Sequence, residues 1–185
     1  MRHGKPGERM RWNAVIDRVY CNTPIVGVEL GVFEGTLSAH LLAQIPKLTL
    51  YMVDRWTAYT TEEIAVTPHS KMPQRSAKYF EEAHGRALVV SESFPDRAVV
   101  VQTDTVEATD FVPDGVDFVF VDARHDYQGI VRDIEAWLPK VTAGGWMFFH
   151  DYGSDRNHPD VRKAVDEYFQ DIEIDADHVA AVRVR

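Results

Sequence analysis

Residues 25–35 read IVGVELGVFEG, and this stretch decides the fold. The β-branched run at 25–30 predicts a buried strand with Glu29 near its carboxyl end. Gly31 and Gly35 follow, and glycine permits the tight turn and close backbone approach found where a strand meets a helix N-terminus. Apolar residues then recur at helical spacing until Pro46, so the stretch predicts a strand–turn–helix unit.

The alternation of strand and helix continues along the chain. Further β-branched runs predict strands at residues 48–53, 98–102, 116–121 and 146–149. Helical patterns occupy residues 37–45, 76–88, 128–140 and those from 159 onward, with Gly144-Gly145 as the stop of the third. Residues 172–184 alternate at period two around Asp177-His178 and predict an antiparallel hairpin. The order predicts an α/β fold, a mostly parallel sheet with an antiparallel C-terminal hairpin and helices on both faces.

Size and charge restrict the function further. The 185 residues carry a net charge of −9, one cysteine and no apolar run long enough to span a membrane. We therefore expect a single cytoplasmic domain over residues 1–185, with no nucleic-acid or membrane partner and no disulfide. Residues 1–20 contain a predicted N-terminal helix whose Trp12 is a candidate homodimer contact. The polar, proline-containing segment 57–75 is a candidate lid.

Five carboxylates stand at or just after the carboxyl ends of the predicted strands. They are Glu29, Asp54, Asp104, Asp122 and Asp151. In an open parallel sheet these ends share one edge, which is where ligands bind. Each carboxylate alone is well explained as a helix or turn cap. Five along one edge need compensation from hydroxyl donors, a cation or a metal, and together they predict a binding site.

The turn also excludes common nucleotide-binding loops. Its glycines at 27, 31 and 35 are four residues apart, which is neither the G-x-G-x-x-G of nicotinamide and flavin enzymes nor a phosphate-binding loop. Glu34 would repel a pyrophosphate, so the turn favours a cationic or zwitterionic ligand. Asp54 ends the next strand, where a carboxylate accepts both hydroxyls of a ribose.

These residues resemble the class I S-adenosylmethionine-dependent methyltransferases, whose Rossmann-like sheet has an antiparallel seventh strand. The E-x-G-x-x-x-G turn and Asp54 match their cofactor loop and ribose-binding acid. A second set of motifs resembles a small bacterial group of O-methyltransferase-like domains with the pattern D-G-x-H-x-Y…D…W-L…G-G…H-D. Here the matching residues are VDARHDY at 121–127, Asp133, Trp137-Leu138-Pro139, Gly144-Gly145 and His150-Asp151. The similarity spans roughly residues 24–152.

The resemblance implies S-adenosylmethionine as cofactor and assigns its contacts. Glu29, Gly31 and Gly35 would hold the methionine part, and Asp54, Arg55 and Trp56 the ribose and adenine. Asp104 and Thr105 would contact the adenine end, and Asp122 would lie between cofactor and acceptor. Ala123 replaces the usual glycine, and Arg124 stands where an acidic or small residue is common, so substrate preference is expected to differ.

The implied reaction is O-methyl transfer to a hydroxyl of a small molecule, with a sugar or glycoside as one acceptor class. A hydroxyl needs a base or a metal to react at neutral pH. In one solution Asp122, His150 and Asp151 bind Mg²⁺ or another divalent metal. In the other, His150 or His125 is the general base, oriented by Asp122 or Asp126.

Two alternatives from other classes stay open at this point. One is an NAD-dependent oxidoreductase on a related sheet, against which the missing G-x-G-x-x-G stands. The other is a non-catalytic ligand-binding module on the same fold, suggested only by Ala123 and Arg124.

Overall fold

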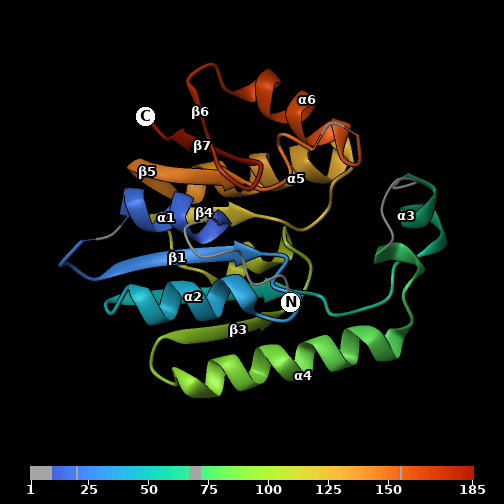
Figure 1. The fold of residues 1–185 in the computed structure, drawn as a ribbon, viewed down its shortest axis with the longest axis horizontal. Helices are drawn as coiled ribbons and strands as arrows, with labels where there is room; N and C mark the ends of the chain where they lie inside the picture. Colours follow the sequence, from blue (N-terminus) through green and yellow to red (C-terminus); the bar gives the residue numbers. More distant parts are fainter. Residues whose placement is uncertain (1–9, 20, 67–71, 155) are drawn as a thin grey trace.

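The computed structural model describes residues 10–19, 21–66, 72–154 and 156–185, and Figure 1 shows the fold. Seven strands form one sheet in the order β3-β2-β1-β4-β5-β7-β6. They are β1 (Ile25–Leu30), β2 (Leu48–Asp54), β3 (Ala98–Gln102), β4 (Val116–Val121), β5 (Val141–Phe149), β6 (Ile172–Asp175) and β7 (Val179–Arg183). The first five pair in parallel, and β7 runs antiparallel to both β5 and β6. The predicted mixed sheet is confirmed.

The strand order reverses between β1 and β4, which are neighbours in the sheet. From β1 the chain builds outward through β2 to β3, and it then returns to the centre to form β4 and β5. Crossovers on the two sides of this point leave a crevice at the carboxyl ends of the strands. The topology therefore places the predicted acidic residues of β1, β2 and β4 around one position.

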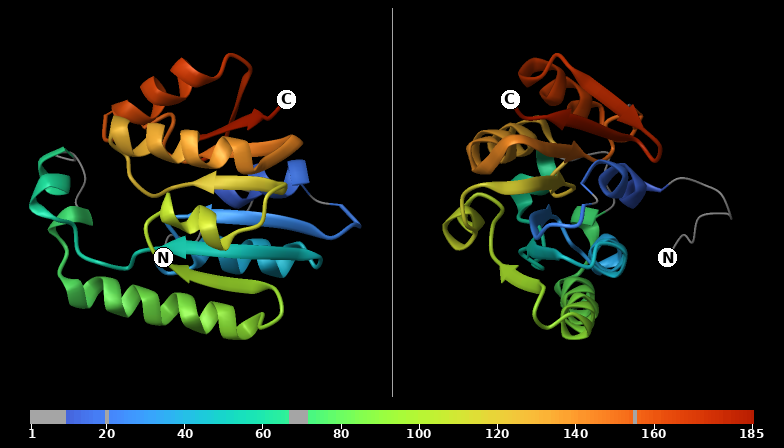
Figure 2. Two further views of the ribbon diagram at one scale, coloured as in Figure 1. Left: turned by 180° about the vertical axis from the view of Figure 1, so that it is seen from behind. Right: turned by 90° about the vertical axis from the view of Figure 1, so that its left-hand side faces the viewer.

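Helices cover both faces of the sheet (Figure 2). The helices are α1 (Arg11–Val19), α2 (Thr36–Gln44), α3 (Thr61–Val66), α4 (Ala77–Ser93), α5 (Tyr127–Trp137) and α6 (Pro159–Tyr168), with the 3₁₀ turns η1 (Met72–Gln74), η2 (Glu107–Phe111) and η3 (Leu138–Lys140). Val15, Leu41 and Ala87 bring α1, α2 and α4 into one apolar core. Ile134 and Val165 bring α5 and α6 into a second core on the opposite face.

Three predicted boundaries differ from the structure. Gly144 and Gly145 do not stop a helix, because they lie inside β5, which begins at Val141. Gly144 has φ +84 and donates its N–H to the Val184 carbonyl at 2.8 Å, so glycine serves an irregular part of the strand. Helix α4 continues five residues beyond the predicted end at Leu88, since no proline or glycine lies between Leu88 and Pro95.

The N-terminal segment and the segment predicted as a lid both contain helical structure, and the lid itself stays a prediction. Helix α1 lies within the predicted 1–20 segment, of which residues 1–9 and 20 are outside the described residues. The 57–75 segment contains α3 and η1, and its residues 67–71 are likewise outside. Among the described helices, each is too short or too polar to cross a bilayer.

Candidate active site

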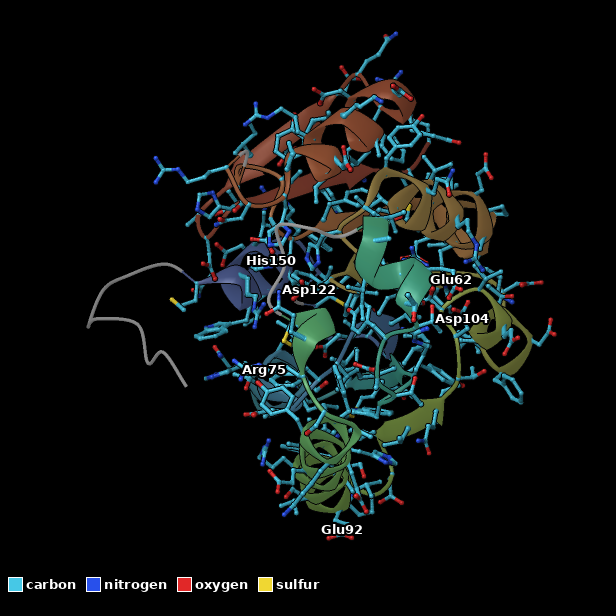
Figure 3. The ribbon with its side chains drawn as sticks, turned by 90° about the vertical axis from the view of Figure 1, so that its right-hand side faces the viewer. Glu62, Arg75, Glu92, Asp104, Asp122 and His150 are labelled. Atoms are coloured by element: carbon cyan, nitrogen blue, oxygen red, sulfur yellow. The ribbon has the colours of Figure 1, made fainter. Side chains whose placement is uncertain are left out.

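A cavity of about 250 Å³ opens at the carboxyl edge of the sheet. Four of the five predicted carboxylates line it: Glu29, Asp54, Asp104 and Asp122. Figure 3 looks onto this end of the molecule, with Asp104 and Asp122 on either side of α3. The fifth carboxylate, Asp151, lies beside Asp122 rather than in the cavity wall. The structure thus brings the five acidic strand ends together.

Glycine at position 31 lets the ends of β1 and β4 touch. Its φ is +87, and a Cβ there would lie 2.2 Å from the carbonyl oxygen of Asp122. The Asp122 N–H donates to the Leu30 carbonyl at 2.8 Å. Any side chain at position 31 would therefore push the first turn away from the acid that follows β4. Gly35, with φ +78, turns the chain into α2 but does not line the cavity.

Glu29 is buried at the centre of the site, with 2% of its surface exposed. It accepts a short hydrogen bond from the Ser38 hydroxyl of α2. Burial raises the pKa of Glu29 to about 8, outweighing Ser38 and the charge of Arg11. A cationic group placed beside Glu29 would favour its ionised form.

Asp54 ties the end of β2 to the first turn. Its two carboxylate oxygens accept the backbone N–H groups of Phe33 and Trp56, each at 2.8 Å. Burial raises the pKa of Asp54 even though these bonds favour the ionised form. Each carboxylate oxygen offers about two acceptor positions, so the group retains capacity for a further pair of hydroxyl donors.

Trp56 supports the turn and does not line the cavity. Its indole N–H donates to the Phe33 carbonyl at 2.7 Å, and only 5% of the residue is exposed. The ring stacks on half-buried His84 of α4, with centroids 4.4 Å apart. The structure gives the indole a packing role behind the site.

Asp122, His125, His150 and Asp151 form a compact cluster at the ends of β4 and β5. One ligand atom from each lies within 4.8 Å of all the others. His150 Nδ1 lies 3.2 Å from Asp122 Oδ1 and 3.4 Å from Asp151 Oδ2. His125 Nε2 lies 3.3 Å and 3.2 Å from the same two oxygens. The predicted metal set of Asp122, His150 and Asp151 is thus joined by His125.

The donor atoms of this cluster fit a divalent cation. His125 Nε2 is buried between the two carboxylates and makes no regular hydrogen bond with any described residue. Two carboxylate oxygens and two imidazole nitrogens suit manganese, iron or zinc better than magnesium, which prefers oxygen ligands. The arrangement is therefore a candidate metal centre whose donor set departs from the Mg²⁺ expectation.

Charges within the cluster are strongly coupled. Burial would lower the pKa of both imidazoles, but Asp122 and Asp151 outweigh it and raise the pKa of His125 to about 9 and of His150 to about 10. Burial would likewise raise the pKa of the two carboxylates, and the imidazoles instead hold it well below the usual range. Two positive and two negative groups then balance, as two neutral imidazoles and two carboxylates would around a divalent cation.

Three arginines line the cavity: Arg55, which was predicted to contact the cofactor, Arg124, which was predicted to alter substrate preference, and Arg11, which was not predicted. Arg11 reaches from α1 and pairs with Asp122 Oδ2 at 2.7 Å. Arg55 and Arg124 both pair with Glu63 of α3, at 2.6 Å and 3.5 Å. No local motif predicts that Arg11 lies in the site, because its partner Asp122 is 111 residues away in the chain.

Asp104 and Thr105 sit in the loop after β3, as predicted, and two motif residues hold that loop. The Thr105 hydroxyl donates a short hydrogen bond to Asp133 Oδ1, and the Trp137 indole N–H donates to the Thr105 carbonyl at 2.9 Å. Asp104 pairs with Arg132 at 3.4 Å. Asp133 and Trp137 of α5 thereby fix the wall assigned to the adenine end.

The fold and site define a Rossmann-like α/β protein with an acidic crevice at its topological switch point. A family model described as methyltransferase domain matches residues 28–152, and the chain belongs to that family. The match runs from the last three residues of β1 to Tyr152 and so includes the carboxyl ends of the strands around the cavity.

Two relatives in sequence carry no assigned activity. The uncharacterized protein R132 of Acanthamoeba polyphaga mimivirus is 29% identical over 148 residues, covering 79% of this chain and 60% of its own length. The uncharacterized protein y4gI of Sinorhizobium fredii is 31% identical over 74 residues, covering 40% of this chain and 8% of its own. The chain therefore spans less than two thirds of each relative.

Solved structures of methyltransferases share the fold. A proposed caffeoyl-CoA O-methyltransferase from Staphylococcus aureus aligns with a TM-score of 0.67 at 10% identity, over 96% of this chain and 84% of that one. The calicheamicin methyltransferase CalS11 aligns with a TM-score of 0.66 at 17% identity, over 93% and 76%. The O-methyltransferase NovP aligns with a TM-score of 0.62 at 18% identity, over 93% and 75%. At these identities the likeness establishes the fold alone.

Proposed function

We propose that the chain is an S-adenosylmethionine-dependent O-methyltransferase that acts on a hydroxyl of a small molecule, with sugars and glycosides as the first acceptor class to test. The observation that carries the proposal is the shared cavity. Asp122 and His125 of the four-residue cluster line the same cavity as Glu29, Gly31 and Asp54 of the predicted cofactor site. O-methyltransferases among the structural neighbours support the same reaction type.

The residues present fit the cofactor. Asp54 retains acceptor capacity for two ribose hydroxyls while its oxygens hold the first turn. Glu29 is a buried acid that a cationic amino group would stabilise in its charged form. In this proposal Asp104 and Thr105 contact the adenine end, whereas Gly35 and Trp56 shape the turn from outside the cavity.

The bound cofactor would supply an electrophilic methyl group on a sulfonium. The acceptor oxygen would form a bond to that methyl carbon as the sulfur–carbon bond breaks, and the hydroxyl proton must leave. Asp122 and His150 would orient the hydroxyl, and a neutral imidazole of His150 or His125 would accept its proton. Alternatively, a divalent metal held by Asp122, His125, His150 and Asp151 would occupy both imidazoles and lower the pKa of the hydroxyl, whose proton would then pass to solvent.

Calorimetric titration with S-adenosylhomocysteine tests the proposal directly. We expect saturable binding in the micromolar range, and NADH titrated in parallel should give no heat. Incubation with radiolabelled S-adenosylmethionine and a panel of sugars and glycosides then tests the acceptor. Absence of heat at millimolar S-adenosylhomocysteine would overturn the cofactor assignment.

A further inference from the structure

The short helix α3 reaches two arginines at the cavity through the carboxylate of Glu63. None of its residues is buried, and the apolar Ile64 and Val66 are 41% and 49% exposed. The side chain of Glu63 is the least exposed of these, with only 12% of its surface accessible. Figures 1 and 3 show α3 beyond the carboxyl ends of the strands. The helix therefore gains little from apolar burial, and Glu63 supplies its described polar attachment.

Glu63 is held between two arginines that come from different strands. Arg55, which follows β2, donates from Nη1 and Nη2 to the two carboxylate oxygens at 2.6 and 3.2 Å. Arg124, which follows β4, places Nη1 3.5 Å from Glu63 Oε1. Both arginines line the cavity. A paired, fork-to-fork contact of this kind is the preferred geometry for a carboxylate.

Each arginine is oriented by a partner other than Glu63. The Arg55 guanidinium lies over the ring of Tyr59, with its carbon 5.4 Å from the centroid. Arg124 Nε donates to buried Asp126 at 2.7 Å. A Cβ at Gly129 would lie 2.6 Å from the Cβ of Arg124, so the absence of a side chain there makes room for this arginine. Each guanidinium group therefore has a described contact besides the one with Glu63.

From this geometry we infer that Arg55 and Arg124 form a carboxylate-binding subsite for the acceptor, and that Glu63 is an internal ligand which the acceptor's carboxylate displaces. The inference rests on the proposed function and narrows its acceptor class to hydroxylated carboxylic acids, which among sugars and glycosides means those that carry a carboxylate. Arg124 follows Asp122 by two residues and lines the same cavity, so the bound carboxylate would place the remainder of the acceptor beside the His–Asp cluster.

Replacing the Glu63 carboxylate by an acceptor carboxylate would leave the charge around the two arginines unchanged. Arg55 and Arg124 face the carboxylates of Glu63 and Asp126 in the present arrangement. An acceptor carboxylate in place of Glu63 leaves the same number of charges in the site, whereas a neutral acceptor would leave the arginine pair without its second counter-charge. The subsite therefore discriminates against neutral analogues of an acidic acceptor.

Binding of benzoate to the full chain, saturated with S-adenosylhomocysteine, tests the subsite without knowledge of the acceptor. Arginine Nε–Hε NMR signals report on the two guanidinium groups, and benzamide is the neutral match. We expect Glu63→Gln to bind benzoate at least tenfold more tightly than wild type, with shifts at Arg55 and Arg124. The control Glu62→Gln, an exposed position on the same helix, should behave as wild type.

Adding Arg124→Gln to Glu63→Gln should remove the gain in benzoate affinity. Circular dichroism confirms that each variant is folded. The inference is overturned if Glu63→Gln binds benzoate no better than wild type, or if benzamide shifts the same signals equally. S-adenosylhomocysteine binding by wild type is scored separately, so a failure of the proposed function is distinguishable from a failure of the subsite.

Discussion

His150 Nδ1 lies 3.2 Å from Asp122 Oδ1, although 28 residues separate the two in the chain. The distance follows from strand register, because Val121 of β4 pairs in parallel with Phe149 of β5. The backbone N–H of His150 also donates to the Val121 carbonyl at 3.0 Å, which extends the pairing of the two strands by one residue. Two adjacent rigid strands therefore place the acid and the imidazole, and the contact needs no ligand to assemble it.

Because the cluster is preassembled, a divalent metal should stabilise the folded chain. We expect the melting temperature to rise in Mn²⁺ or Zn²⁺, since a ligand at 100 times its Kd adds about 2.7 kcal/mol to the free energy of unfolding. His125→Ala and Asp151→Asn should lose most of this rise in a thermal denaturation series. The exposed His178 serves as control, and His178→Asn should respond as wild type. An equal rise in all four proteins would place the metal elsewhere.

Replacing Asp54 tests the ribose assignment. Asp54→Ala removes the acceptor of two backbone N–H groups and the predicted acceptor of the ribose hydroxyls. We expect S-adenosylhomocysteine affinity to fall at least tenfold and the free energy of unfolding to fall by about 1–3 kcal/mol. Calorimetry and urea denaturation measure the two effects. Unchanged affinity in a folded variant would contradict the assignment.

The sequence alone predicted the strands, their mostly parallel order and the acidic edge, because each rests on local periodicity or on a residue next to a strand end. It predicted that Asp122 and Asp151 share a site for the same reason, since parallel strands bring their carboxyl ends together, and the resemblance to O-methyltransferases added His150. The addition of His125 was foreseen as a base rather than a metal ligand. Its Nε2 lies 3.3 Å from Asp122 Oδ1 and 3.2 Å from Asp151 Oδ2, and the motif spacing alone does not give this side-chain direction.

What the sequence did not predict depends on long-range contacts and side-chain direction. Arg11 meets Asp122 across the whole first half of the chain, and Arg55 was assigned to the cofactor although its guanidinium binds Glu63. Trp56 follows Asp54 as a purine-stacking residue would, but its φ of +49 and its bond to Phe33 direct the indole into the core. Gly144 and Gly145 were predicted to end the preceding helix, because a glycine pair after a helical pattern is equally consistent with a helix terminus and with an irregular strand.

Asp133 should make stability depend on pH. Burial raises its pKa to about 7, with the Thr105 hydroxyl bond opposing the shift. The folded state therefore favours the protonated acid, and the stability that this group contributes is full below the unfolded pKa of 3.8 and is lost as pH rises through about 7. Asp133→Asn removes the titration and keeps an acceptor for Thr105.

Urea denaturation of wild type and Asp133→Asn between pH 4 and 9 measures this effect. We expect the variant to gain stability relative to wild type as pH rises, by up to roughly 4 kcal/mol at about 1.4 kcal/mol per pKa unit. The comparison isolates Asp133 from Glu29, whose pKa is also raised and is common to both proteins. Parallel pH profiles for the two proteins would show that Asp133 is ionised in the fold throughout.

Substitutions at Gly31 and Gly115 distinguish the cost of a left-handed backbone from the cost of a steric clash. Both residues have positive φ, at +87 and +77. A Cβ at Gly31 would lie 2.2 Å from the Asp122 carbonyl, whereas at Gly115 nothing lies within 4 Å. Gly115→Ala should cost about 1–2 kcal/mol of unfolding free energy, the penalty of the left-handed conformation alone. Gly31→Ala should cost several kcal/mol more and lower S-adenosylhomocysteine affinity, since the backbone of β1 or β4 must move. Equal losses in urea denaturation, with unchanged cofactor affinity, would mean that the contact between Gly31 and Asp122 does not shape the site.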